Sequence, residues 1–193
     1  MVLGLYAGDA NEGESIIQPL RELAKPIVDQ TAVIPFLQLQ QKLDPMIPPR
    51  INCYGTSLFL DELSEESLDA FLGYVDTPPT PGFLVQLWSL GGKMNEIAAD
   101  ASPFAIRDAK WALLVDAMAM NGDDEACQKW IDDLYDGLLP FSHKKASYLN
   151  AICPAPNVTS IAFGQNLERL VQVKKQYDPT NIFRNNHTIE GTE

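Results

Sequence analysis

The sequence predicts a domain that contains both helices and β-strands. Its 193 residues are enough for one domain with a sizeable core, and 46% apolar with 21% charged residues is typical of a folded globular protein. Short apolar runs bounded by turn residues alternate with stretches of helical periodicity. This alternation alone favours a parallel α/β fold, but the same element order also fits an antiparallel α+β sheet.

The first 50 residues predict two strands and two helices. Residues 2–7 form an apolar run closed by Gly8 and Asp9, which predicts a buried strand. A helix should follow, with Asn11 as a candidate N-cap and acidic residues in its first turn. A second strand is predicted over 26–34 and a short helix over 35–42. The stripe of the first helix expected to face the core consists of Ile16, Ile17, Leu20 and Leu23.

The middle of the chain predicts three more strands and two more helices. Residues 51–60, 83–90 and 111–118 are rich in apolar and β-branched or aromatic side chains, which favours strands. Ser64 is the expected N-cap of a helix with Leu68, Phe71, Leu72 and Val75 facing the core. A longer helix should open near residue 121. Its expected inner side consists of Trp130, Ile131, Leu134, Tyr135 and Leu138.

The composition excludes several classes of function. A formal charge of −12 and a pI near 4.5 argue against nucleic acid or an anionic membrane as a partner, because such sites need clustered Lys and Arg. Three scattered cysteines and two histidines, His143 and His187, predict neither a metal site nor a disulfide framework. There is no apolar run of 18 residues and no pattern of a signal peptide, so a cytoplasmic location is expected.

The last part of the chain predicts a helix and a tail rich in turn residues. Leu167, Leu170, Val171 and Lys174 share one side of the helix, and Asp178-Pro179 should end it at about Tyr177. We expect a region over 1–161 and a C-terminal segment over 162–193, packed together as one globular unit.

Two runs in this segment carry a resemblance to a known family. Residues 163–170, FGQNLERL, and residues 177–185, YDPTNIFRN, resemble the C-terminal signature of the berberine bridge enzyme-like, FAD-linked oxidases. The opening strand that ends in Gly-Asp resembles the start of the family's substrate domain. The resemblance implies an α+β fold, in which helices cover one face of an antiparallel sheet. It covers the substrate domain and the C-terminal berberine-like segment, and nothing in residues 1–193 resembles the family's FAD-binding domain.

The resemblance also points to Tyr148 and Asn150 as cofactor-binding residues. Residues 146–153 predict a strand, in which side chains two apart point to one face. By residue type alone, a core tyrosine beside a turn-capping asparagine explains the pair equally well. The family carries Tyr-x-Asn-Tyr here, close to the isoalloxazine ring and the substrate, and this chain has Ala151 in place of the second tyrosine.

No catalytic residue is assigned from the sequence. Ala151 has no proton to exchange, and Leu113 stands where some members of the family carry a general-base carboxylate. Asp116 offers a substitute carboxylate, and the alternative is a solvated side chain at a strand end. Gln86, Trp88 and Asp116 are the candidate substrate-binding residues.

The resemblance implies oxidation of a small organic molecule by hydride transfer to FAD. We expect the chain to be inactive alone and to work with a flavin-domain polypeptide or as a homodimer. Because the usual proton-transfer groups are lost, the alternative is a non-redox, free-standing domain that binds a small molecule or a partner. Such a domain would be a cyclase or isomerase of natural-product biosynthesis, or a pseudoenzyme. A truncated fragment of a longer protein is a further alternative.

Overall fold

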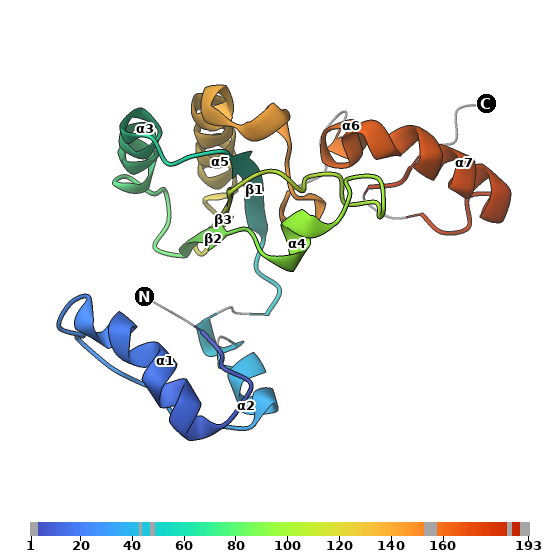
Figure 1. Cartoon of the computed structure of the whole chain (residues 1–193). Coiled ribbons are helices and arrows are strands. Elements are labelled where there is room, and N and C mark those ends of the chain that lie inside the picture. Colours follow the sequence, from blue (N-terminus) through green and yellow to red (C-terminus); the bar gives the residue numbers. More distant parts are fainter. Residues whose placement is uncertain (1–3, 43, 47–48, 153–157, 185–186, 190–193) are drawn as a thin grey trace. The chain divides into compact units, whose positions relative to one another are not determined.

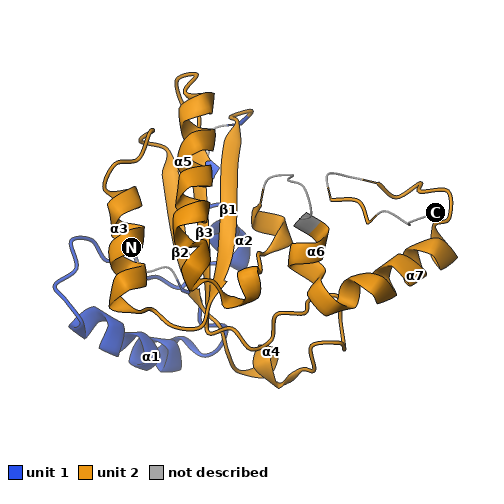
Figure 2. Cartoon of the chain, turned by 90° about the horizontal axis from the view of Figure 1, so that it is seen from above, with its two compact units in different colours: residues 1–49 blue, residues 50–193 orange. Residues whose placement is uncertain are grey.

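The computed structural model describes residues 4–42, 44–46, 49–152, 158–184 and 187–189. Figure 1 shows the chain coloured along its sequence. Its contacts divide it into two compact units, Met1–Pro49 and Arg50–Glu193, which Figure 2 shows in blue and orange. The boundary expected near residue 161 lies inside the second unit. Within the described ranges, no helix combines the length and the apolar character needed to cross a bilayer.

The first unit contains helices α1, Ala10–Glu22, and α2, Phe36–Gln40. Asp9, and not Asn11, is the N-cap of α1, and its carboxylate accepts hydrogen bonds from the backbone N–H groups of Asn11 and Glu12. Both strand predictions here are wrong for the described residues, since 4–7 and 26–34 form no strand. A strand needs a neighbour to pair its backbone groups, and neither segment has one.

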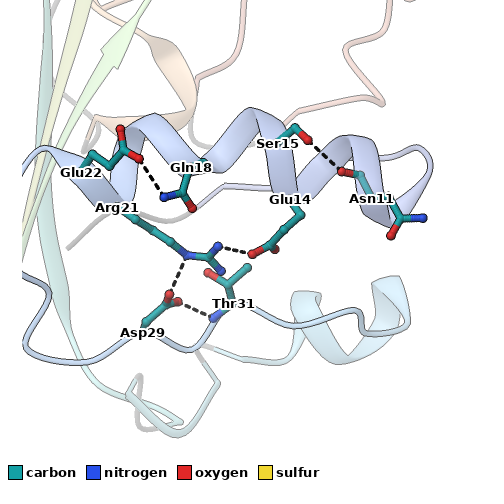
Figure 3. Close-up of polar contacts among 8 residues, drawn as sticks. All are labelled: Asn11, Glu14, Ser15, Gln18, Arg21, Glu22, Asp29 and Thr31. Atoms are coloured by element: carbon teal, nitrogen blue, oxygen red, sulfur yellow. Dashed lines mark hydrogen bonds and ion pairs between the residues drawn. The ribbon is translucent and has the colours of Figure 1, made fainter.

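A polar cluster around Arg21 joins α1 to the segment that follows it (Figure 3). The guanidinium group of Arg21 pairs with Glu14, and its Nε lies 2.7 Å from Asp29 Oδ2. The backbone N–H of Thr31 donates to Asp29 as well, and hydrogen bonds from Thr31 and Arg21 lower the pKa of Asp29 to about 2. The apolar stripe expected to face inward is exposed, apart from the half-buried Ile17, so polar contacts hold this unit together.

The second unit is built on a sheet of three antiparallel strands in the order β1-β3-β2. The strands are β1, Cys53–Leu60, β2, Phe83–Ser89, and β3, Trp111–Met118, which confirms the three strand predictions in this region. Because every pairing is antiparallel, the class is α+β, as the resemblance implied, and the parallel reading of the element order is wrong.

Helices α3, Glu65–Val75, and α5, Asp124–Leu138, cover one face of this sheet (Figure 2). The expected inner side of α5 is confirmed, since Trp130, Ile131, Leu134 and Leu138 are buried. They pack against side chains of β1 and β3 that alternate along the strands. These strand residues are Leu58, Leu60, Leu113, Val115 and Ala117.

Helix α3 begins as predicted, and two of the four residues expected to face the core, Phe71 and Val75, pack against it. The hydroxyl of Ser64 accepts a hydrogen bond from the Ser67 N–H, which confirms the N-cap. Leu68 and Leu72 are exposed, contrary to the expectation. The stripe that faces the core runs through the buried Ser67 and the partly buried Ala70, Phe71 and Tyr74, which have the i, i+3, i+4, i+7 spacing of one helix face.

The C-terminal part contains the short helices α4, Lys93–Glu96, and α6, Val158–Phe163, and the longer α7, Leu167–Tyr177. Helix α7 ends where Asp178-Pro179 predicted, and Leu167, Leu170, Val171 and Lys174 are its less exposed side. Among the described residues, five short 3-10 turns complete the second unit and the end of the first. They span Asp44–Met46, Leu139–Phe141, His143–Lys145, Leu149–Ala151 and Gly164–Asn166.

The strand predicted over 146–153 is wrong. Leu149–Ala151 is a 3-10 turn, and Cys153 lies outside the described residues. Both backbone groups of Tyr148 are bonded to a side chain and not to a neighbouring strand. Its N–H donates to Ser57 Oγ over 2.8 Å, and its carbonyl accepts from the same hydroxyl over 3.2 Å.

Candidate functional site

The face of the sheet opposite α5 carries the candidate substrate-binding residues. Side chains of β3 alternate between the two faces, so Asp116, Leu114 and Ala112 point away from α5. Directly opposite on β2 stand Leu84, Gln86 and Trp88, and on β1 Gly55, Ser57 and Phe59. The structure therefore brings Gln86, Trp88 and Asp116 to one face of one sheet, which we call the open face.

Trp88 and Gln86 form the part of the open face on β2. Trp88 is 46% exposed, and its indole Nε1 donates a hydrogen bond to Gln86 Oε1 over 3.3 Å. This bond orients the indole ring along the strand. An exposed indole face beside an amide is suited to hold an apolar or aromatic body and one polar group.

Asp116 is the half-buried carboxylate of the open face. Burial raises its pKa above the ordinary value for an aspartate, because the low-polarity surroundings disfavour the charged form. Gly55 makes room for it: a Cβ atom at residue 55 would lie 2.6 Å from Asp116 Oδ1. The thiol Sγ of Cys53 lies 4.0 Å from the same oxygen. A carboxylate with a raised pKa is suited to take a proton from a substrate.

Leu113, which the resemblance placed at the position of a general base, lies on the other face. It is buried in the core beneath α5. A carboxylate at residue 113 would therefore point into the core, whereas Asp116 points to the open face.

Tyr148 and Asn150 meet even though no strand holds them. The Nδ2 of Asn150 donates to the Tyr148 hydroxyl over 3.0 Å across the 3-10 turn. Since Ser57 points to the open face, its two bonds to the Tyr148 backbone anchor this segment beside that face. Ala151, in place of the second tyrosine, packs against the apolar cluster that includes Phe59 and Leu114.

Two polar residues with a structural role were not predicted from the sequence. The buried imidazole of His143 lies 2.6 Å from Asp61 Oδ1 through Nδ1 and 2.9 Å from Asp108 Oδ1 through Nε2. Hydrogen bonds from Lys144 and His143 lower the pKa of Asp108. Both ring nitrogens are occupied, so this histidine joins the end of β1 to the approach of β3. Its partners are 82 and 35 residues away in the sequence, where no local pattern reveals them.

Asn166, in the C-terminal signature, is the second such residue. Its side chain is buried, and Nδ2 lies 2.6 Å from the Ala99 carbonyl and 3.0 Å from the Ser102 carbonyl. The asparagine therefore ties the start of α7 to a loop that precedes β3.

The described residues fit a flavin ring better than a whole FAD. The Tyr148 hydroxyl and the Asn150 amide offer hydrogen bonds at an aromatic cluster, which suits a planar ring with polar edges. Arg107 lies at the same cluster, but it is committed to the protein. Its guanidinium donates to the carbonyls of Phe104 and Met94 and to the Ser102 hydroxyl, which leaves it poorly placed for a pyrophosphate. Across the described ranges, no group of His, Cys, Asp or Glu is arranged to hold a metal ion.

Comparisons of the sequence identify relatives of this chain. Residues 147–190 match the family described as berberine and berberine-like. An FAD-linked oxidoreductase of Dictyostelium discoideum is 27% identical over 193 residues, which is 98% of this chain and 42% of that protein. Reticuline oxidase of Papaver somniferum is 31% identical over 134 residues, 56% of this chain and 25% of that enzyme.

The fold is also found among solved structures. Xylooligosaccharide oxidase of Myceliophthora thermophila, in complex with xylobiose, superposes with a TM-score of 0.73 at 18% identity, over 96% of this chain and 44% of that one. The chain thus spans less than half the length of the relatives it matches. The C-terminal residues 147–190 therefore match the berberine and berberine-like family, and the chain as a whole is similar to proteins named FAD-linked oxidoreductase and reticuline oxidase and shares the fold of berberine bridge enzyme.

Proposed function

We propose that this chain is the substrate-binding portion of an FAD-dependent oxidoreductase that oxidises a small organic molecule. The observation that carries the proposal is the open face, on which Gln86, Trp88 and Asp116 point the same way in a chain with these relatives. The substrate lies against the Trp88 indole, and the Gln86 amide fixes one of its polar groups.

In this proposal Asp116 is the proton acceptor. When bound, FAD supplies the chemistry of hydride acceptance from the substrate carbon. The protein must then take the proton of the substrate's O–H or N–H group, and Asp116 Oδ1 is the group on the open face that can do so. Burial raises its pKa, which makes it a stronger base than an ordinary aspartate. Tyr148 and Asn150 would hold the isoalloxazine ring of FAD.

We further propose that a flavin-binding polypeptide supplies the other FAD contacts and docks on the C-terminal tail. The Asp178 carboxylate accepts hydrogen bonds from the N–H groups of Ile182 and Phe183 and pairs with Lys174, so the tail is a built loop. This loop presents apolar side chains to solvent: Tyr177, Ile182 and Phe183 are 74%, 72% and 79% exposed. An apolar surface of this kind supports a docking role.

Titration of FAD into the purified chain tests the proposal, alone and with the flavin-binding polypeptide of the same protein. We expect little quenching of flavin fluorescence alone and saturable quenching with the second polypeptide. Binding and turnover by the chain alone would contradict the docking role. A homodimer that binds FAD would point to a second copy as the partner.

Asp116 is tested in the reconstituted protein by the rate of flavin reduction. D116N removes the base without changing its size, and we expect a loss of about 10²–10⁴-fold. D136N is the matched control, because Asp136 is exposed on α5. A wild-type rate in D116N would remove Asp116 from the mechanism.

A second candidate function is a non-redox domain that binds a small molecule and acts on it by acid–base chemistry. Asp116 favours it, since a half-buried carboxylate can exchange protons without a cofactor. A substrate that binds the open face while FAD does not bind, even with the second polypeptide present, would decide for this alternative.

A further inference from the structure

Strand β2 lies at one edge of the sheet, and nothing in the described part of the chain pairs with its outer side. The opposite edge, formed by β1, is covered by a later segment. There the Phe59 N–H donates to the Ala146 carbonyl over 3.3 Å, and Leu60 forms a bridge with Ser142. The outer edge of β2 is therefore the place at which a further strand can add to the sheet.

The hydrogen bonds at the two ends of β2 show which of its backbone groups point outward. The Met118 N–H donates to the Gly82 carbonyl, and the Leu90 N–H donates to the Lys110 carbonyl. Both contacts direct backbone groups toward β3, and the alternation of an antiparallel ladder gives the same direction to the even-numbered residues between them. The N–H and C=O groups of the odd-numbered residues therefore point to the outer edge. These residues are Phe83, Val85, Leu87 and Ser89.

The side chains of β2 do nothing to keep another strand away. Natural sheets protect a free edge with charged side chains, proline or a bulge. The seven residues of β2, FLVQLWS, include no charged residue and no proline, in a chain of formal charge −12. Apolar side chains are exposed on both faces beside this edge: Phe83 and Leu87 on the helix side and Trp88 on the open face. The edge therefore favours a partner strand.

We propose that β2 pairs with β2 of a second copy of this chain, antiparallel and across a two-fold axis at Gln86. Gln86 is the middle residue of the strand, so this register opposes every residue of β2 to another residue of β2. It also brings the odd-numbered residues opposite one another, and their outward N–H and C=O groups bond. No like charges meet, so two acidic chains can approach here. The opposed pairs are Gln86 with Gln86, Trp88 with Leu84, Leu87 with Val85, and Phe83 with Ser89.

This pairing joins the open faces of the two copies into one surface. Directly opposed residues point to the same face of a sheet, so Trp88 of one copy stands beside Leu84 of the second copy. The second copy thereby extends the face that carries Gln86 and Asp116. The inference does not depend on the oxidation proposed above, because it rests on the backbone groups and the composition of β2.

Charges placed at residue 86 test the pairing, with sedimentation velocity of the purified chain as the readout. Q86K and Q86E each put two like charges directly opposite each other, and each alone should raise the dissociation constant of the dimer by about tenfold. An equimolar mixture of the two variants should dimerise again, because lysine then faces glutamate. Q172K and Q172E are the matched controls, since Gln172 is exposed on α7, and they should dimerise as the wild type does.

Hydrogen exchange of the wild type gives a second, independent result if a charge variant does not fold. Protection of the four outward-pointing amides of β2 should rise with protein concentration. The proposal is overturned if the wild type stays monomeric at millimolar concentration, if both charge variants dimerise as the wild type does, or if mixing them restores nothing. Protection of these amides in the monomer would overturn it as well, because another segment would then occupy the edge.

Discussion

Replacing Asn166 by aspartate isolates the role of one signature residue in the fold. The carboxylate has nearly the same shape as the amide, but it cannot donate hydrogen bonds to the carbonyls of Ala99 and Ser102. Two lost hydrogen bonds account for about 2 kcal/mol, and a buried carboxylate against carbonyl oxygens adds about 1 kcal/mol or more. We therefore expect N166D to lower the free energy of unfolding by about 3 kcal/mol at neutral pH.

The loss of unfolding free energy in N166D should depend on pH, and the carbonyls of Ala99 and Ser102 set the direction of this dependence. They disfavour the charged carboxylate, so its pKa in the folded state should lie above the unfolded value of about 3.9. A group of this kind contributes its stability below the unfolded pKa and loses it as the pH rises through the folded pKa. The deficit of N166D relative to the wild type should therefore shrink as the pH falls through this raised pKa.

Urea denaturation followed by tryptophan fluorescence, at several pH values, measures this deficit. Q165E is the matched control: it makes the same chemical change one residue earlier, at an exposed side chain, and should cost less than about 0.5 kcal/mol. A deficit in N166D that equals the control, or that does not change with pH, would refute the tethering role.

Three further predictions concern the site and the tail. G55A should lower the pKa of Asp116 toward its ordinary value, because the added Cβ displaces the carboxylate from its half-buried position; ¹³C NMR titration measures it, and G73A, whose Cβ meets nothing, should leave it unchanged. S147A should raise the free energy of unfolding by about 1 kcal/mol, since it removes a buried hydroxyl without a partner; a fall would show that the hydroxyl is bonded. The pairing with the lysine of α7 lowers the pKa of Asp178, so its contribution is present above the ordinary pKa and is lost as the pH falls through the lowered one. In D178N, hydrogen exchange at the backbone amides of Ile182 and Phe183, which donate to this carboxylate, should lose this acid dependence. An unchanged pH profile of exchange would contradict the assignment.

The sequence predicted well those elements that local pattern determines. Strands 83–89 and 111–118 and the inner side of α5 follow from side-chain periodicity, which reports directly which face is buried. The pairing of the strands did not follow from periodicity. It needed the family resemblance, because the alternation of helix and strand is the same in both sheet types.

The incorrect strand predictions share one physical cause. Residues 26–34 and 146–152 have the composition of strands, but a strand exists only where a second strand pairs with it. At Tyr148 the hydroxyl of Ser57 takes the place of that partner, 91 residues away in the sequence. At the site, Gln86, Trp88 and Asp116 were named from the sequence and lie on one face. Gly55, which gives Asp116 its room, could only be found from the strand register.

The hydrogen bonds of Asn166 give this signature residue a structural role, which says nothing about a reaction. Asn166, in the run by which the C-terminal segment is recognised, ties helix α7 to a loop, whereas Gln86, Trp88 and Asp116 lie on a sheet face assembled from other segments. Substitutions on that face leave residues 163–170 and 177–185 unaltered. A match to this run therefore identifies a shared structural contact between a helix and a loop. The reaction has to be determined from the residues of the open face.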